Sequence, residues 1–294
     1  MTGKTSIILV NYNTSEVTRR CIRSIYAQVR EPMEIIVVDN ASKDNSVRDI
    51  AAEFEDVQVI ESGGNIGFGS ANNLGVRTAT GEYIFLLNSD TILRNDPLPY
   101  FIEALQENEQ TGVVGAYLTD QDGKPSLSGG RTYSIQKYLS LGMRAYLHLV
   151  GSKHQHPSHP QVDYVIGADM FMRKSLFEAT GGFDERIFMY FEDVELCDRI
   201  TRSGYKNRLV KGPEIVHLEK AEGQNMFVKI HNMASLMYCM QKKYPRWQFR
   251  LFQLTFFLLK LPLMILKGER EYVMAAWHWE RYMRNNNDIK HTER

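Results

Sequence analysis

The stretch "FLLNSDTIL", residues 85–93, begins with large apolar residues that lead directly into Asn88, Ser89 and Asp90. A continuous apolar run of this kind is typical of a strand that is buried on both faces of a sheet. A buried carboxylate without a partner costs several kcal/mol, or its pKa shifts until the group is neutral. Asp90 therefore either caps the turn that follows the strand or holds a positively charged group.

Apolar segments alternate with segments of helical spacing on both sides of this stretch. We expect strands within residues 5–10, 33–42, 57–62, 81–90 and 111–118, and helices at 15–28, 46–54, 72–78 and 97–107. This alternation predicts an α/β fold with a mainly parallel sheet that helices cover on both faces. Sheets of this type bind ligands at the carboxyl ends of their strands.

Polar residues follow four of the predicted strands. Asn11 and Asn13 follow the first strand, Asp39 the second, Asn65 the third and Asp90 the fourth. Because the carboxyl ends of parallel strands meet at one edge of the sheet, we expect these side chains to lie close together. Asn and Asp are also common turn formers, and this preference accounts for some of these positions.

The composition excludes several classes of protein. The chain has 294 residues, the length of one large domain or of one domain with an appendage. Lys+Arg and Asp+Glu are equal at 35 each, which argues against a dedicated nucleic-acid-binding protein. Cys21, Cys197 and Cys239 show neither metal-ligand spacing nor a disulfide framework. With an apolar N-terminal stretch too short for a signal peptide, the sequence predicts a cytoplasmic protein.

The alternating pattern breaks between residues 119 and 163. This stretch is rich in turn residues, with a short helix predicted at 135–150, and long excursions of this kind are often functional. His154, His156 and His159 lie in it, but their proline-interrupted spacing fits no standard zinc site. We therefore expect a solvated loop here.

Two glycines at 67 and 69 suggest a dinucleotide-binding fingerprint, but their context does not fit one. The fingerprint belongs in the first strand-to-helix turn and requires a third glycine. Here the loop follows the third strand, and Asn72 stands at the third glycine position. A nicotinamide-dependent dehydrogenase is therefore not expected.

Regular structure is predicted again beyond residue 161. A strand precedes a helix that begins near Lys174 and ends at Gly181-Gly182. A second helix has Glu192 and Asp193 at its start, where the helix dipole favours anions. A further strand is predicted in "NRLVKGPEIVHLEK", ending near His217.

Five motifs occur in order along the chain: "SIILVNYN", "IIVVDNASKDNS", "NIGFGSANNLGVRTATGEYIFLLNSDTIL", "GADMFMRKSLFEATGGFDERIFMYFEDVELCDRITRSGYK" and "VHLEKAEG". Together they resemble family 2 glycosyltransferases, and more closely their bacterial rhamnosyltransferase-like branch. The resemblance covers roughly residues 4–225. It implies a GT-A fold and an inverting transfer from a nucleotide-activated sugar, in bacterial surface polysaccharide synthesis. It also implies Mg²⁺ or Mn²⁺, which would stabilise the diphosphate leaving group.

The resemblance assigns the metal ligands. The family's DxD signature corresponds here to Asn88-Ser89-Asp90, with Asn in place of the first Asp. Asp90 is then the metal carboxylate, while Asn88 and Ser89 contact the nucleotide sugar. His217 matches a position that ligates the metal in related enzymes, although a lone histidine at a strand end is also often structural.

The resemblance also assigns the catalytic and donor-binding residues. Asp193 matches the base that takes the proton from the acceptor hydroxyl, and Glu192 would help to hold the acceptor. Both acids could instead only serve the helix N-terminus. Asp39 matches the residue that accepts an imide N–H from uracil or thymine. The same nucleotide pocket would be lined by Asn11, Asn13, Asn65 and Asn73.

The tail from residue 225 to 294 differs from the catalytic region, which we place at 1–224. Residues 247–268 are strongly apolar, but Arg250, Lys260 and Pro262 interrupt them, so the segment cannot supply the about 20 apolar residues that span a bilayer. From Lys242 onward there are 11 Lys+Arg against 5 Asp+Glu, and all three tryptophans lie here. This pattern predicts amphipathic helices on the inner surface of an anionic membrane, which suits a lipid-linked saccharide acceptor. Packing on the catalytic region, or on a second copy in a homodimer, is the alternative.

Two other functions share some of these features. A sugar nucleotidyltransferase would use metal chemistry at a strand end, but it needs a basic, glycine-rich N-terminal loop that "VNYNTSEVTRR" does not provide. An inactive sugar-binding or scaffold subunit need not keep Asp90, Asp193 and His217. The expected donor is dTDP-rhamnose by resemblance, or a UDP-sugar, because Asp39 could accept from either pyrimidine base.

Overall fold

The computed structural model describes residues 3–132, 134–136, 157, 159–218, 226–267 and 270–284, and these divide into two compact units. The first comprises Met1–Arg131, His154–Glu185 and Glu192–Lys220, and the second comprises Thr132–Lys153, Arg186–Phe191 and Ala221–Arg294. The division expected after residue 224 lies near the last of these boundaries. The sequence pattern does not indicate that the segments 132–153 and 186–191 group with the C-terminal helices.

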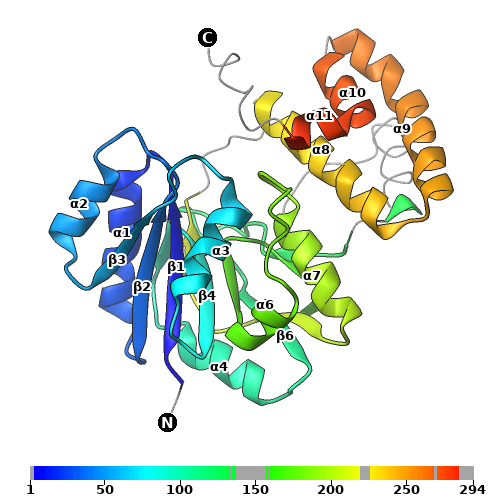
Figure 1. The fold of residues 1–294 in the computed structure, drawn as a ribbon. Helices are drawn as coiled ribbons and strands as arrows, with labels where there is room; N and C mark the ends of the chain where they lie inside the picture. The colour runs from blue at the N-terminus through cyan, green and yellow to red at the C-terminus, as the bar shows by residue number, and fades with distance from the viewer. Residues whose placement is uncertain are drawn as a thin grey trace. The chain divides into compact units, whose positions relative to one another are not determined.

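The first unit is built on a sheet in which eight described strands have the order β3-β2-β1-β4-β10-β6-β11-β8 (Figure 1). The neighbouring strands are parallel except where β10 meets β4 and β6 and where β8 meets β11. The expectation of a mainly parallel sheet is confirmed. The strands are β1 Thr5–Asn11, β2 Met33–Asp39, β3 Val57–Glu61, β4 Tyr83–Asn88, β6 Thr111–Ala116, β8 Gln161–Val162, β10 Asp169–Arg173 and β11 Lys206–Val210.

Helices cover both faces of this sheet. The apolar side chains of α1, α2 and α4 pack into one core, and those of α3, α6 and α7 pack into the other. The helices are α1 Ser15–Gln28, α2 Ser46–Glu53, α3 Phe68–Thr78, α4 Leu98–Gln106, α6 Lys174–Ala179 and α7 Glu192–Arg202. This double cover explains why the central strands are apolar without interruption.

Strand β4 shows how the two cores share one run of residues. Side chains alternate along a strand, so Phe85 and Leu87 enter one core while Ile84 and Leu86 enter the other. The run ends at Asn88, where the strand reaches the edge of the sheet. In the aligned registers Asn88 lies opposite Val10 of β1, and the residue after Val10 lies opposite Asp39 of β2.

One predicted strand is two strands in the structure. The segment expected to form a single strand ending near His217 divides into β11 and β12 Ile215–His217, with Gly212 at φ +113° and Pro213 between them. A proline and a glycine with positive φ do not fit the interior of a strand. Strand β12 leaves the main sheet and pairs antiparallel with β5 Thr91–Leu93. A further small pair joins β7 Gly129–Gly130 to β9 Tyr164–Val165.

Helix α3 begins earlier than its composition suggests. The expected start was Asn72, but the helix begins at Phe68, directly after Gly67 at φ +87°. The Gly67 carbonyl accepts a hydrogen bond from the Ala71 amide at 3.1 Å. The first turn of α3 is not predicted from the sequence, because it is rich in glycine and asparagine and both residue types have low helix propensity.

The second unit contains the C-terminal helices α8 Met226–Lys243, α9 Arg246–Lys267, α10 Arg270–Trp277 and α11 Trp279–Arg284. Helix α8 packs against α10 and α11, and α9 packs against α10. Within the described ranges, no helix is sufficiently long and apolar to cross a membrane. The helix predicted at 135–150 lies outside the described residues apart from positions 135 and 136, and so do His154 and His156.

The close packing of α3 on the sheet can be tested by substituting Gly75. A β-carbon there would lie 2.6 Å from Ile8 Cγ2 and 3.1 Å from Val38 Cγ2. Alanine normally stabilises a helix by about 0.5–1 kcal/mol over glycine, but overpacking costs about 1–3 kcal/mol. We expect Gly75→Ala to lower the free energy of unfolding by about 1–2 kcal/mol, measured by urea denaturation.

Gly64→Ala is the matched control, since a β-carbon at Gly64 would have no heavy atom within 4 Å and the φ of this residue is not positive. We expect that variant to change the unfolding free energy by less than about 0.5 kcal/mol. An unchanged or more stable Gly75→Ala protein would contradict the close approach of α3 to the sheet.

Candidate functional site

A buried hydrogen-bond network ties the ends of β1 and β2 together. Asn11 Nδ2 donates to Asp39 Oδ1 at 2.7 Å and to Ser42 Oγ at 2.9 Å. The hydroxyls of Thr14 and Thr18 donate to Asn11 Oδ1 at 2.9 and 2.7 Å. The amide of Asn11 is therefore fully used within the protein, and it fixes the position of the Asp39 carboxylate.

Asp39 is only 3% exposed, and its Oδ2 accepts the Ser42 backbone amide at 2.9 Å. A carboxylate has about four acceptor sites, so two bonds leave capacity for a ligand donor. The imide N–H of a pyrimidine base is a donor of this kind. Recognition of the base by Asp39 remains a prediction that this geometry permits.

Asn13 and Asn65 help to order the loops at the same edge. Asn13 has φ +56°, and its Oδ1 accepts the Lys43 backbone amide at 2.7 Å. Asn65 Oδ1 accepts from Asn40 Nδ2 at 2.9 Å. These contacts shape the rim of the expected nucleotide pocket, and direct contact of either side chain with a nucleotide stays a prediction.

Asn73 has a different position from the other predicted nucleotide ligands. Its Nδ2 donates to the Phe183 carbonyl at 2.9 Å, and its Oδ1 accepts the Phe183 amide at 2.9 Å. Nδ2 also donates to Glu185 Oε1 at 3.1 Å. The side chain therefore joins α3 to the turn that follows α6, and its predicted contact with the nucleotide is untested.

The structure brings Asn88, Asp90 and His217 together. Asp90 Oδ1 and His217 Nε2 are 3.3 Å apart, and Asn88 Nδ2 and the same histidine nitrogen are 3.4 Å apart. The pairing of β12 with β5 places His217 opposite Thr91, next to Asp90. Ser89 is half-buried between the two polar residues of the loop. The His217 side chain is 7% exposed and that of Asp90 is 36% exposed, so the carboxylate can reach a ligand from solvent.

These donors fit a divalent cation that also binds a diphosphate. Two neighbouring ligands of an octahedral Mg²⁺ ion, each at about 2.1 Å, lie about 3 Å apart. The 3.3 Å between Asp90 Oδ1 and His217 Nε2 is close to that spacing. Over the described residues, no cluster of three or more His, Cys, Asp or Glu residues could hold a metal. A cation held by Asp90 and His217 would therefore complete its coordination with substrate phosphate oxygens and water.

Asp193 and Glu192 begin α7 in unlike surroundings. Asp193 is half-buried, its Oδ2 accepts the Gly167 amide at 2.9 Å and its Oδ1 accepts the Val194 amide at 2.7 Å. Glu192 is 6% exposed, and its Oε2 has no hydrogen-bond partner among the described residues. Tyr190 and Phe191, directly before them, have φ of +66° and +69°, a conformation that is rare for bulky residues and clusters at functional sites.

Burial controls the ionisation of this acidic pair. It raises the pKa of Glu192 to about 8, with the neighbouring charge of Asp193 as the second cause. Burial also raises the pKa of Asp193, against the effect of its backbone donors. Glu192 is thus a neutral acid at pH 7 that can donate a hydrogen bond, while a raised pKa brings Asp193 nearer to that of an effective general base.

Two adjacent residues connect the acidic pair to the loop that carries Asn88 and Asp90. Gly167 donates to Asp193, as described above, and the carbonyl of Ala168 accepts the Asn88 amide at 2.9 Å. The site is tightly packed at this point. A β-carbon on Gly167 would lie 3.0 Å from the Phe68 ring, and one on Gly69 would lie 2.9 Å from Phe183 Cβ. The glycines near residue 68 thus permit close packing of the site.

One residue near this site was not singled out from the sequence. Asp169, next to Ala168, is fully buried, its Oδ2 accepts the Ala116 amide and its Oδ1 has no partner in the described part of the chain. Burial raises the pKa of this carboxyl well above its usual range. The signal was available, because an acidic residue in an apolar strand is the same feature that drew attention to Asp90.

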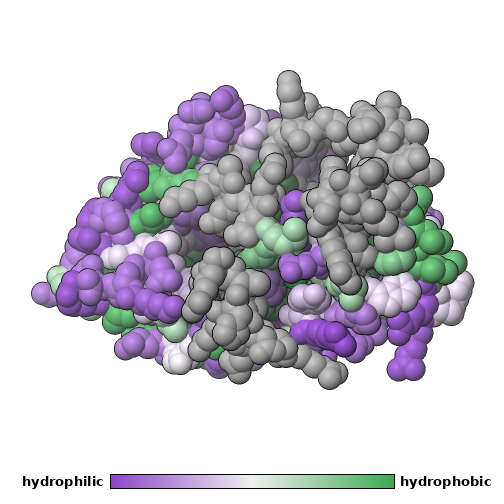
Figure 2. All heavy atoms as spheres, turned by 90° about the horizontal axis from the view of Figure 1, so that it is seen from above, coloured by the Kyte–Doolittle hydropathy of each residue, from purple (hydrophilic) through white to green (hydrophobic). Residues whose placement is uncertain are grey.

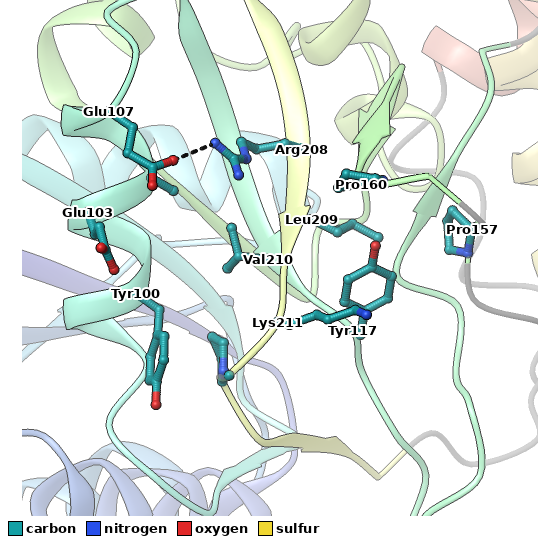
Figure 3. Close-up of a pocket in the computed structure, with 13 residues that line it drawn as sticks. Tyr100, Glu103, Glu107, Tyr117, Pro157, Pro160, Arg208, Leu209, Val210 and Lys211 are labelled. Atoms are coloured by element: carbon teal, nitrogen blue, oxygen red, sulfur yellow. Dashed lines mark hydrogen bonds and ion pairs between the residues drawn. The ribbon is translucent and has the colours of Figure 1, made fainter.

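A separate cavity of about 700 Å³ lies between α4 and β11 of the first unit (Figure 3). Tyr100 and Glu103 border it on the side of α4, and Arg208 Nη1 pairs with Glu107 Oε2 at 3.1 Å. The described residues that line it include none of the predicted site residues.

Comparison with known proteins identifies the family. Residues 6–181, more than half of the chain, match the profile described as "Glycosyl transferase family 2". A relative from Mycobacterium tuberculosis, "N-acetylglucosaminyl-diphospho-decaprenol L-rhamnosyltransferase", is 25% identical over 238 residues, which cover 74% of this chain and 76% of that protein. "Rhamnosyltransferase WbbL" of Escherichia coli is 28% identical over 254 residues, covering 81% of this chain and 93% of the relative.

A solved structure has the same fold. It is the mannosyltransferase PcManGT from Pyrobaculum calidifontis in complex with GDP-Man and Mn²⁺, with a TM-score of 0.59 and 17% identity. The alignment covers 96% of this chain and 75% of that one. This agreement supports the expected GT-A fold with a helical C-terminal region.

If Asp90 and His217 hold a metal ion, neutralising Asp90 will weaken the binding of that ion measurably. We expect Asp90→Asn to weaken the binding of Mn²⁺ in the presence of a pyrimidine nucleoside diphosphate by at least about 10-fold, because even outer partners of metal ligands change metal affinity by about 10–100-fold. Electron paramagnetic resonance of free Mn²⁺ measures this directly. Asp122→Asn is the control, since that carboxylate pairs with Lys124 on an exposed turn, and equal Mn²⁺ affinity in both variants would contradict the assignment.

Because the Glu192 carboxyl is buried, we expect the stability of the folded protein to depend on pH. Its pKa is raised from 4.5 to about 8, so between these values the folded protein holds a proton that the unfolded chain releases. The stability of wild type relative to Glu192→Gln should therefore fall as the pH rises through this window, by up to about 1.4 kcal/mol per pH unit, and stay level above it. Urea denaturation across the window measures the difference. The control is Glu103→Gln at an exposed position, whose free energy of unfolding should vary with pH as that of wild type does. If Glu192→Gln also varied with pH as wild type does, Glu192 would be ionised in the folded protein.

Proposed function

The chain belongs to glycosyltransferase family 2, and on this basis we propose that it is a metal-dependent, inverting enzyme that transfers a sugar from a pyrimidine nucleoside diphosphate donor to a lipid-linked saccharide. The observation that carries the proposal is the placement of Asp90 and His217, 3.3 Å apart, at the end of β4. Asp193 is linked to the same loop through Gly167 and Ala168.

The first requirement of the reaction is to stabilise the departing diphosphate. A divalent cation supplies this stabilisation by neutralising charge on the phosphate oxygens as the sugar bond breaks. In this chain Asp90 and His217 would hold the cation. Asn88, whose Nδ2 lies 3.4 Å from the same histidine nitrogen, would donate to a phosphate or ribose oxygen, because the one lone pair of that nitrogen would bind the cation.

The second requirement is a base on the acceptor side. Asp193 would remove the proton from the acceptor hydroxyl as its oxygen attacks the anomeric carbon. The amides of Gly167 and Val194 orient the carboxylate, and its raised pKa makes it a stronger base. One displacement inverts the anomeric configuration, so the chemistry needs no protein nucleophile. Neutral Glu192 would donate a hydrogen bond to the acceptor saccharide.

The donor is proposed from the nucleotide pocket and the relatives together. Asp39 can accept the imide N–H of thymine or uracil, which favours a pyrimidine nucleotide. The two relatives described above are named as rhamnosyltransferases, which favours dTDP-rhamnose over UDP-sugars. One of them is named for a diphospho-decaprenol acceptor, which supports a lipid-linked acceptor on the inner face of the plasma membrane.

A donor-hydrolysis assay tests the proposal without knowledge of the acceptor. The protein is incubated with Mg²⁺ or Mn²⁺ and a panel of nucleotide sugars, and the release of nucleoside diphosphate is followed. We expect dTDP-rhamnose to be hydrolysed slowly, with activity lost on chelation and in Asp90→Asn. Asp193→Asn should reduce the rate by about 10²–10⁴-fold, the usual contribution of a general base.

Asp122→Asn is again the control and should hydrolyse the donor at the wild-type rate. Preferential hydrolysis of a UDP-sugar would identify that UDP-sugar, and not dTDP-rhamnose, as the donor. Hydrolysis that persists with chelator, or in Asp90→Asn, would overturn the metal role. Absence of both turnover and calorimetric nucleotide binding would favour an inactive, sugar-binding subunit.

A further inference from the structure

Helix α9 carries a row of exposed apolar side chains, which we call the outer stripe. Trp247, Leu251, Leu254 and Leu258 have 67%, 59%, 47% and 60% of their surfaces exposed. Steps of four, three and four residues place all of them on one side of a helix. Figure 2, coloured by the hydropathy of each residue, shows hydrophobic residues in separate groups among hydrophilic ones on one face of the molecule.

The opposite side of α9 is already buried, so the helix cannot turn to hide the outer stripe. Phe249, Phe252 and Phe256 are between 1% and 5% exposed. Gln253, on the same side, is 2% exposed and its Nε2 donates to the Ala276 carbonyl of α10 at 3.0 Å. A surface helix normally has one apolar side, and α9 has two. The inner side holds the helix in its unit. Among the described residues the outer stripe remains exposed, with Trp247 and Leu251 bordering a pocket beside residues 134–136.

The charge of α9 identifies the kind of partner. Its sequence contains Arg246, Arg250, Lys260 and Lys267 and no acidic residue. Arg246 and Arg250 are exposed, lie one turn apart and flank Trp247 in the sequence. An anionic surface therefore complements this helix. A second copy docked through the same stripe would bring like charges together, which disfavours self-association.

We propose that the outer stripe docks the protein on an anionic lipid bilayer, with α9 lying in the plane of the membrane surface. Helices that bind in this way insert an apolar side at the boundary of headgroups and acyl chains and keep basic residues near the anionic headgroups. Tryptophan, here at the first turn of α9, favours the same depth. The inference deepens the proposed function, on which it rests for the lipid-linked acceptor. Surface binding itself requires no donor chemistry.

Sedimentation with lipid vesicles tests this proposal on the full chain. Vesicles of phosphatidylcholine alone are compared with vesicles that also contain phosphatidylglycerol. We expect the protein to sediment with the anionic vesicles and to dissociate as salt is raised. The double variant Leu251→Ser/Leu258→Ser should lose affinity by about 10-fold or more, because it removes apolar area from the inserted side. Arg246→Glu/Arg250→Glu should abolish the preference for anionic vesicles.

Leu127→Ser is the matched control, because Leu127 is a leucine of the first unit that is 38% exposed. It should bind vesicles as wild type does. Circular dichroism checks that each variant is folded. Vesicle binding that is unchanged in Leu251→Ser/Leu258→Ser would overturn the proposal. A dimer in analytical ultracentrifugation that this variant abolishes, without vesicle binding by wild type, would also overturn it and make the stripe a subunit interface.

Donor hydrolysis without vesicles, measured on the same samples, separates this inference from the proposed function. The outer-stripe variants should hydrolyse the donor at the wild-type rate, because their residues are not among the donor-site residues. Vesicle binding by a protein that hydrolyses no donor would leave the docking surface standing and refute the donor chemistry. Donor hydrolysis by a protein that binds no vesicles would support the donor chemistry and refute the docking surface.

Discussion

The hydrogen bond from the Gly167 amide to Asp193 Oδ2 is the contact on which the candidate site depends. The carbonyl of the next residue, Ala168, accepts the Asn88 amide, so one dipeptide contacts both the acidic pair and the loop that carries Asn88 and Asp90. This is possible because β10 runs antiparallel to β4 and brings its N-terminal end to the strand ends where Asn88 lies. The predicted base and the loop that carries Asn88 and Asp90 are thus both hydrogen-bonded to backbone atoms at the sheet edge.

Much of the first unit could be predicted from the sequence. The positions of β1, β2 and β4 follow from apolar runs, which a sheet covered on both faces requires, although their ends differ from the expected ones by one to three residues. The polar residues at their ends follow from the common direction of parallel strands, and the aligned registers place Asn11 opposite Asp39. Local composition is sufficient here because each strand and its end are decided by adjacent residues.

The features that sequence did not reveal depend on contacts between distant residues. The direction of β10 and the separation of β12 from β11 are set by the strands that they pair with. The sequence around Asn73 suggests a polar residue at a loop or helix surface. In the structure its side-chain amide donates a hydrogen bond to the carbonyl of Phe183, 110 residues away. An acidic residue at Asp169 is visible in the sequence, but its complete burial depends on β4 and β6, which pair with its strand on either side. No window of local sequence contains these partners.

The position of His217 on the short strand β12 has a consequence for how the protein is made. Asn88 and His217 are separated by 129 residues, so the ribosome completes β1 to β4 long before the histidine exists. The contact between Asp90 and His217 closes a very long loop, and such contacts form late because their chain entropy must be overcome first. A nascent chain that ends before β12 therefore contains β1 to β4 but lacks the pair of Asp90 with His217. If Asp90 and His217 hold a metal as proposed, the protein can capture that metal through both residues only late in its synthesis.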